Sequence, residues 1–256
     1  MKQDWGLDEL VRHMPDFRGR RAGIIGLMGL LSFAAASIVM IGVDRLWPAW
    51  TGVGQVGMIV VGFVWTAQFF WRRKEYKRRW DDQAYRHAFS RHAVVGLPVI
   101  FAAIAHNVYL PGKRMLFGEM TPLVVTLGGY FLLTGLVLWV RSIIAFGFDN
   151  LAMLYVYFPE AGRMVESSIY ALIRHPVYSG VVRVGLGLGL WRGTPFSIAF
   201  GLFMPLGLTL WVRLVEEEEL IERFGEGYVS YRREVPAFWP RLGDVKSPWK
   251  FLVVGN

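Results

Sequence analysis

The 256-residue chain is rich in apolar residues, with 54% hydrophobic and 19% charged side chains. Ordinary globular chains contain about 45–50% apolar residues even with glycine counted. The sequence has no cysteine, which excludes disulfides, thiolate nucleophiles and cysteine-ligated metals. The net charge of +8 comes from Lys and Arg beside long apolar blocks, a pattern that sets membrane topology and argues against a nucleic-acid partner.

Four apolar blocks predict membrane-spanning helices, at about 22–43, 53–71, 93–110 and 122–146. A helix needs about 20 apolar residues to cross the hydrocarbon layer of a bilayer, and the third block is somewhat short. The second and third blocks are separated by a basic segment, 72–91, which holds eight Lys and Arg residues. We expect this segment to be a cytosolic loop that contacts anionic membrane lipids.

The last apolar region, 180–214, is interrupted at 192–195 by the sequence Arg-Gly-Thr-Pro. This pattern predicts a helical hairpin whose first arm is too short to span the membrane upright. The charged tail that follows is expected to be helical and cytosolic. The fold class is therefore all-α: a polytopic integral membrane protein with four spanning helices, a C-terminal hairpin and a cytosolic helical tail. We divide it into membrane helices at 1–146 and a C-terminal region at 147–256, which contains the hairpin and the tail.

The distribution of cations predicts the orientation of the chain. With a cytosolic N-terminus, the inside segments are 1–21, 72–91, 147–179 and 213–256, and these hold 22 Lys and Arg residues. The turns on the other side hold 4. Because cytosolic loops carry the excess of Lys and Arg, we expect both termini and the segment 147–179, with any site that it forms, to face the cytosol.

A first polar stretch, Arg174-His175-Pro176, lies at the entrance to the hairpin. Pro176 disfavours a helical conformation for His175, and Gly180 permits a close backbone approach as the next helix begins. A cation and an imidazole at the hydrocarbon boundary can bind an anionic group without the full cost of burying charge. The alternative is that both side chains only reach outward to lipid phosphates.

A second polar stretch follows the hairpin, where four glutamates, 216–219, come in succession. Because a hairpin returns the chain to its starting side, we expect Glu216 and Glu217 to lie near Arg174 and His175. A cation–imidazole pair that faces two carboxylates suits a zwitterion such as the amino-acid end of a cofactor. Aromatic side chains nearby could cover a planar base or a sulfonium: Tyr178, Phe224, Tyr228 and Tyr231.

The two stretches together resemble the isoprenylcysteine carboxyl methyltransferase family, in a wider group with phospholipid N-methyltransferases and membrane thiol S-methyltransferases. The pattern is R-H-P-x-Y-x-G, about 35 residues, and then E-E-x-x-L-x-x-x-F-G-x-x-Y-x-x-Y-x-x-x-V-P-x-x-x-P. The matching residues are Arg174, His175, Pro176, Tyr178, Gly180, Glu216, Glu217, Leu220, Phe224, Gly225, Tyr228, Tyr231, Val235, Pro236 and Pro240.

The resemblance implies a pocket for S-adenosylmethionine, roofed by the C-terminal segment, with the methyl acceptor arriving laterally from the bilayer. His175 and one of Glu216 and Glu217 would hold the methionine carboxylate and amine. Tyr178, Tyr228 and Tyr231 would line the pocket. Arg174 would face the acceptor, and we expect Arg174 and Glu217 to be the catalytic residues.

The acceptor is left open by the sequence. Family members often carry Gly-Pro-Tyr where this chain has Ser168-Ile169-Tyr170, so Tyr170 is retained as a substrate-binding candidate but the turn is not. Arg141, late in the fourth block, either binds an anionic part of the acceptor or reaches outward to the membrane surface. A prenylcysteine carboxylate, a phospholipid amine and a thiol remain possible acceptors; an amine would also need a base, for which Glu216, Glu217 and Glu166 are candidates.

Two other classes of function compete with the methyltransferase. One is a membrane NADPH-dependent reductase of the sterol-reductase type, and the other is a membrane subunit without enzymatic activity. The histidines have no metal-ligand spacing with one another or with carboxylates, so we expect no metal site.

Overall fold

The computed structural model describes residues 6–115 and 117–241. Within these residues the chain folds into helices of several lengths, and no strand occurs. Five helical segments are long and apolar enough to cross a membrane. The prediction of an all-α, polytopic membrane protein is confirmed.

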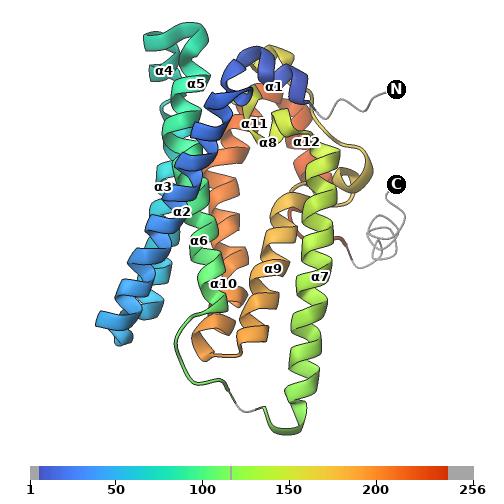
Figure 1. The fold of residues 1–256 in the computed structure, drawn as a ribbon. Helices are drawn as coiled ribbons and strands as arrows, with labels where there is room; N and C mark the ends of the chain where they lie inside the picture. Colours follow the sequence, from blue (N-terminus) through green and yellow to red (C-terminus); the bar gives the residue numbers. More distant parts are fainter. Residues whose placement is uncertain (1–5, 116, 242–256) are drawn as a thin grey trace.

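Three helices form the N-terminal part of the bundle: α2 (Arg20–Leu46), α3 (Thr51–Trp71) and α6 (Val94–Ala105). Helices α2 and α3 both pack on α6 and contact one another less, as Figure 1 shows. Most of the apolar side chains of α2 are exposed in the chain alone, as expected for a helix that faces lipid. These helices coincide with the first three predicted blocks.

The basic segment that we expected to be a loop is folded. It forms α4 (Arg73–Trp80), α5 (Ala84–Ala88) and a π-helical segment, η4 (Phe89–Ala93), that runs into α6. The reason is its small and aromatic residues: Tyr76 and Tyr85 are fully buried in a cluster that also holds Phe69 and Tyr157. Charge dominates the composition of this segment, but the buried tyrosines determine its structure.

The C-terminal membrane part consists of α7 (Thr121–Phe146), α9 (Pro176–Arg192) and α10 (Pro195–Trp211). Helices α9 and α10 are the predicted hairpin. Glycines let α9 pack very closely against α7: a Cβ added at Gly187 would lie 2.6 Å from the backbone nitrogen of Leu132. Such close approach is how helices associate in lipid.

One end of the bundle gathers the remaining helices (Figure 1). These are α1 (Leu7–His13), α8 (Phe148–Leu151), α11 (Glu217–Phe224) and α12 (Glu226–Glu234). The connection to α9 contains short 3-10 turns, and the backbone N–H groups of Arg174 and His175 donate to the carbonyls of Pro236 and Ala237, both at 3.0 Å. These bonds place the C-terminal segment across the entrance to α9. In the connection between α8 and α9, the 3-10 turns are η7 (Leu154–Val156), η8 (Pro159–Ala161) and η9 (Ser168–Ala171).

Candidate active site

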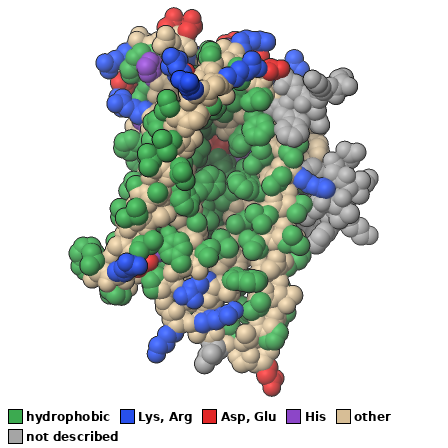
Figure 2. All heavy atoms as spheres, in the orientation of Figure 1, with side chains coloured by type: hydrophobic (Ala, Val, Ile, Leu, Met, Phe, Trp, Pro, Cys, Tyr) green, Lys and Arg blue, Asp and Glu red, His purple; other side chains and the backbone are tan. Residues whose placement is uncertain are grey.

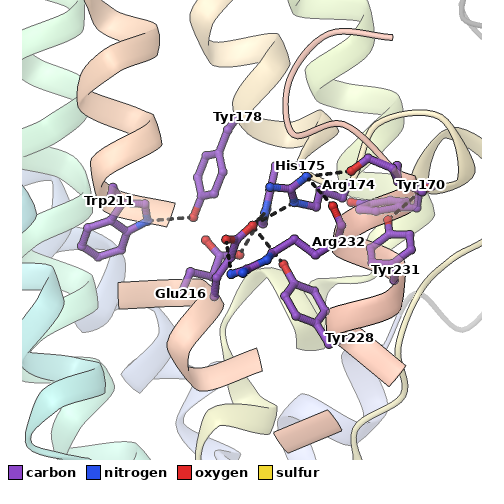
Figure 3. Close-up of polar contacts among 11 residues, drawn as sticks. Tyr170, Arg174, His175, Tyr178, Trp211, Glu216, Tyr228, Tyr231 and Arg232 are labelled. Carbon is purple, nitrogen blue, oxygen red and sulfur yellow. Dashed lines mark hydrogen bonds and ion pairs between the residues drawn. The ribbon is translucent and has the colours of Figure 1, made fainter. Parts of the chain in front are cut away.

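The two polar stretches meet in space, on the same end of the bundle (Figure 3). The Nε atom of Arg174 donates to Oε1 of Glu217 at 2.8 Å, and Nε2 of His175 lies 3.4 Å from the same oxygen. Folding of the α9–α10 hairpin therefore brings an acidic helix exit back to a basic entrance. The turn between the arms is fixed by Thr194, whose side chain caps α10.

Glu217 is the centre of a satisfied polar cluster. Its side chain is 2% exposed. Besides Arg174 and His175, it accepts from Nη1 of Arg232 at 3.3 Å and from the hydroxyl of Tyr228 at 3.4 Å. Arg174 in turn donates through Nη1 to the carbonyl of Val235 at 2.7 Å. A buried charge is tolerated when it is paired and hydrogen-bonded in this way, and the cluster ties α11 and α12 to the entrance of α9.

A cavity of about 320 Å³ lies beside this cluster. Glu217 and Arg141 are not among the described residues that line it. Glu166, a candidate base, does not line it either, whereas Phe224 and the remaining site candidates do: Tyr170, Arg174, His175, Tyr178, Glu216, Tyr228 and Tyr231.

Glu216 faces the cavity, although it adjoins Glu217 in the chain. It ends a π-helical segment, Val212–Glu216, that joins α10 to α11. Its Oε1 lies 3.8 Å from Nδ1 of His175, while its Oε2 is buried and has no hydrogen-bond partner within the described chain. An unsatisfied buried carboxylate oxygen costs free energy, so this atom is suited to a cationic ligand.

The tyrosine hydroxyls are held by hydrogen bonds. Tyr178 accepts from the indole N–H of Trp211 at 3.2 Å, and Tyr231 donates to the carbonyl of Tyr170 at 2.6 Å (Figure 3). Burial raises the pKa of Tyr228 and Tyr231 above the ordinary tyrosine value. Both therefore remain protonated hydroxyls that can donate hydrogen bonds near neutral pH.

A second set of charged groups at the cavity was missed in the sequence. Glu219 and Arg223 line it and form an ion pair, with 3.2 Å between Nη2 and Oε2. Oε1 of Glu219 and Nε of Arg223 are buried without hydrogen-bond partners in the described structure. Arg163, from the connection, also lines the cavity. The spacing of Glu216, Glu219 and Arg223 places them on one helical face, and this periodicity was the signal available in the sequence.

Apart from Asn150, the rest of the cavity wall is mostly apolar and comes from both halves of the chain. Figure 2 shows the molecule hollowed between its two sides, with hydrophobic side chains around the hollow. The N-terminal membrane helices, which carry none of the motif residues, thus complete the site. The main apolar lining residues are Phe70 of α3, Leu97 and Phe101 of α6, and Trp139, Ile143 and Phe146 of α7.

Comparison with known proteins gives several matches. Residues 123–227 match the family model described as phospholipid methyltransferase. A methanethiol S-methyltransferase of Crocosphaera subtropica is 25% identical over 166 residues, which cover 57% of this chain and 60% of that protein. Methanethiol S-methyltransferase 2 of Bradyrhizobium diazoefficiens is 36% identical over 89 residues, covering 31% and 32% of the two chains.

A nickel-cobalt-cadmium resistance protein of Alcaligenes xylosoxydans is 30% identical over 105 residues, covering 39% of this chain and 46% of that protein. The chain thus spans 60% or less of the length of these relatives. No solved structure matches. These matches favour neither the reductase nor the non-enzymatic subunit. Over residues 123–227 the chain is similar to the phospholipid methyltransferase family, and these relatives support the membrane methyltransferase group that the sequence pattern resembles.

Proposed function

We propose that this protein is a membrane enzyme that transfers a methyl group from S-adenosylmethionine to a lipophilic or small hydrophobic acceptor, with its active site facing the cytosol. The observation that carries the proposal is a cavity lined both by charged side chains, among them Glu216 with its unpartnered carboxylate oxygen, and by many apolar side chains. A site for a charged amino-acid cofactor and an apolar acceptor needs both kinds of wall.

The residues present fit the cofactor. When bound, S-adenosylmethionine supplies an already activated sulfonium methyl group. The carboxylate of Glu216, which lines the cavity, can accept from the amino group of its methionine part. We assign the carboxylate to Arg163, because His175 lies between two glutamates and Arg174 is engaged by Glu217. Tyr178 and Tyr228 can cover the sulfonium through their rings.

Arg174 and Glu217 then act by holding the site together. Their ion pair fixes the C-terminal segment over the entrance to α9, which keeps water out and holds the lining groups in place. Methyl transfer needs mainly alignment of a nucleophile and exclusion of water. If the acceptor must lose a proton, the carboxylates that line the cavity, Glu216 and Glu219, are available to take it.

The apolar lining of the cavity favours an acceptor with a hydrocarbon part, but it does not distinguish among such acceptors. Phe101 and Trp139 suit the hydrocarbon part of an acceptor, and the hollow between the two halves suits lateral entry from the bilayer. Two relatives are named for methanethiol, and we therefore rank a hydrophobic thiol before a prenylcysteine carboxylate and a phospholipid amine.

The first experiment measures binding of S-adenosylhomocysteine to the purified protein in detergent by calorimetry. We expect saturable binding by the wild type and binding at least tenfold weaker for Glu216→Gln, since a tenfold change corresponds to about 1.4 kcal/mol for a lost charged contact. The control is Glu218→Gln, an exposed neighbour outside the cavity, which should bind like the wild type. No binding by the wild type at millimolar ligand would refute the proposal.

The second experiment tests the acceptor and the competing reductase. Labelled methyl transfer is measured with an alkanethiol, a farnesylcysteine derivative and phosphatidylethanolamine, in parallel with NADPH oxidation on a sterol. Transfer to the thiol that Glu216→Gln slows and Glu218→Gln does not would support the ranking above. NADPH-dependent turnover with S-adenosylmethionine inert would instead favour the reductase.

A further inference from the structure

A second hollow, outside the proposed active site, lies where the basic segment 72–91 meets the membrane helices. We call the helices of this segment, α4 and α5, the basic hairpin. The hollow is a groove of about 760 Å³. Its walls come from α2, α3, α4, α5, the π-helical segment and the beginning of α6, with Tyr76 and Trp80 as the residues of α4. In Figure 2, Lys and Arg side chains and a histidine gather at this end of the molecule, above a surface covered by hydrophobic side chains.

One half of the groove is apolar. Met28 of α2, Trp65 of α3 and Val95 of α6 line it. Met28 and Trp65 are well exposed, at 37% and 44%, and they continue the apolar surfaces of two helices that are long enough to span a membrane. This half of the groove is therefore open to the lipid phase.

The other half is cationic and polar. Arg86, His87, Ser90 and Arg91 line it. Arg86 is paired with Asp16, the carboxylate near this half, and that carboxylate also pairs with Arg21. Within the described chain no ion pair engages Arg91, whose side chain is exposed. The balance of charge at the groove is positive.

The backbone at Arg91 is fixed by an unusual helix. Arg91 lies in the π-helical segment Phe89–Ala93, and its carbonyl accepts from the indole N–H of Trp65 at 2.8 Å. Single π turns within α-helices frequently occur at functional sites. Here the bond holds a cation and an aromatic ring at the level where the apolar half of the groove gives way to the cationic half.

From this arrangement we infer that the groove is a binding site for an anionic phospholipid. The phosphate contacts Arg91 and Ser90, and an acyl chain lies along Met28 and Val95. Trp65 sits at the level of the headgroup, as interfacial tryptophans do. A lipid is the fitting occupant because the apolar half opens directly onto the lipid-facing surface, while the cations complement a phosphate. The site is separate from the methyl-transfer cavity and does not depend on its function.

The test uses the full-length protein in a neutral detergent. Binding of phosphatidylglycerol and of phosphatidylcholine with the same acyl chains is titrated by native mass spectrometry, for the wild type, Arg91→Gln and the control Arg78→Gln. Arg78 is an exposed cation of the basic hairpin that does not line the groove. A cation near a membrane surface contributes about 1 kcal/mol to binding of an anionic lipid, which corresponds to about a fivefold change in affinity.

We expect one phosphatidylglycerol to bind about fivefold or more tightly than phosphatidylcholine. Arg91→Gln should remove this preference, and Arg78→Gln should retain it. Equal affinity for the two lipids, or equal losses in the two variants, would overturn the inference, since the charge would then act diffusely. Glycerophosphoglycerol and inorganic phosphate are added as competitors. Displacement of the lipid by either one at millimolar concentration would show a site for soluble phosphates and would also overturn the inference.

Discussion

Two neighbouring glutamates of this chain lie in opposite surroundings. Glu217 is engaged by two arginines, an imidazole and a phenol. Glu216 lines the cavity, and its buried Oε2 has no hydrogen-bond partner within the described chain. The difference teaches that buried charge serves two purposes in this protein. A satisfied carboxylate holds the chain together, and an unsatisfied one is available to a ligand.

The largest expected effect is the loss of stability when the hydrogen-bonded carboxylate of Glu217 is removed. Glu217→Ala leaves the largely buried Arg174 without its partner, and it also removes the carboxylate from the more exposed Arg232. Removing one member of a buried ion pair typically costs about 3–5 kcal/mol. We expect this loss in thermal unfolding of the detergent-solubilised protein, with little change for Glu218→Ala.

A double variant separates the energy of the Arg174–Glu217 ion pair from the cost of leaving one buried charge unpaired. The cycle compares Arg174→Met, Glu217→Gln and the double variant. Because both charges are gone in the double variant, its stability should recover part of the loss seen with the single changes. An Arg174–Glu217 coupling near zero in this cycle would show that the cluster is not what ties α11 to the entrance of α9.

The meeting of the two polar stretches followed from topology alone. A hairpin must return to its starting side, so the sequence placed Glu217 beside Arg174 without knowledge of distances. The division of labour between Glu216 and Glu217 could not be predicted in the same way. It depends on a π-helical turn that ends at Glu216, and a π turn leaves no clear pattern in the residues.

The contribution of the N-terminal helices was also beyond the sequence. Phe70, Leu97 and Phe101 line the cavity, but in the sequence they are apolar residues within apolar blocks. Periodicity identifies which residues lie in the membrane, whereas tertiary packing decides which of them face a cavity. By contrast, the face formed by Glu219 and Arg223 was present as helical spacing and could have been read.

A smaller effect is expected on cofactor affinity at the cavity that Glu216 lines. Arg163→Gln removes the cation that we assign to the carboxylate of the cofactor. Arg163 is exposed, so the fold should be unchanged, and affinity for S-adenosylhomocysteine should fall by about fivefold, or about 1 kcal/mol. Calorimetry on Arg163→Gln and Arg163→Lys makes the measurement. If both variants bind like the wild type, the carboxylate is held elsewhere, with Arg223 the next candidate.

The smallest effect is expected from the ion pairs between α4 and α11, next to the cavity. Arg73 of α4 lies 2.8 Å from Oε2 of Glu222 and 3.7 Å from Oε1 of Glu219. Because Arg223 also pairs with Glu219, Arg73→Gln leaves that carboxylate partly compensated. We expect less than about 1 kcal/mol of destabilisation and about a twofold loss of cofactor affinity, while Lys74→Gln, which loses only an exposed contact with Glu222, changes neither. A loss of affinity as large as that of Glu216→Gln would mean that the basic hairpin forms part of the cofactor site itself. The cofactor site would then include a residue of α4, in addition to the C-terminal residues around Glu216.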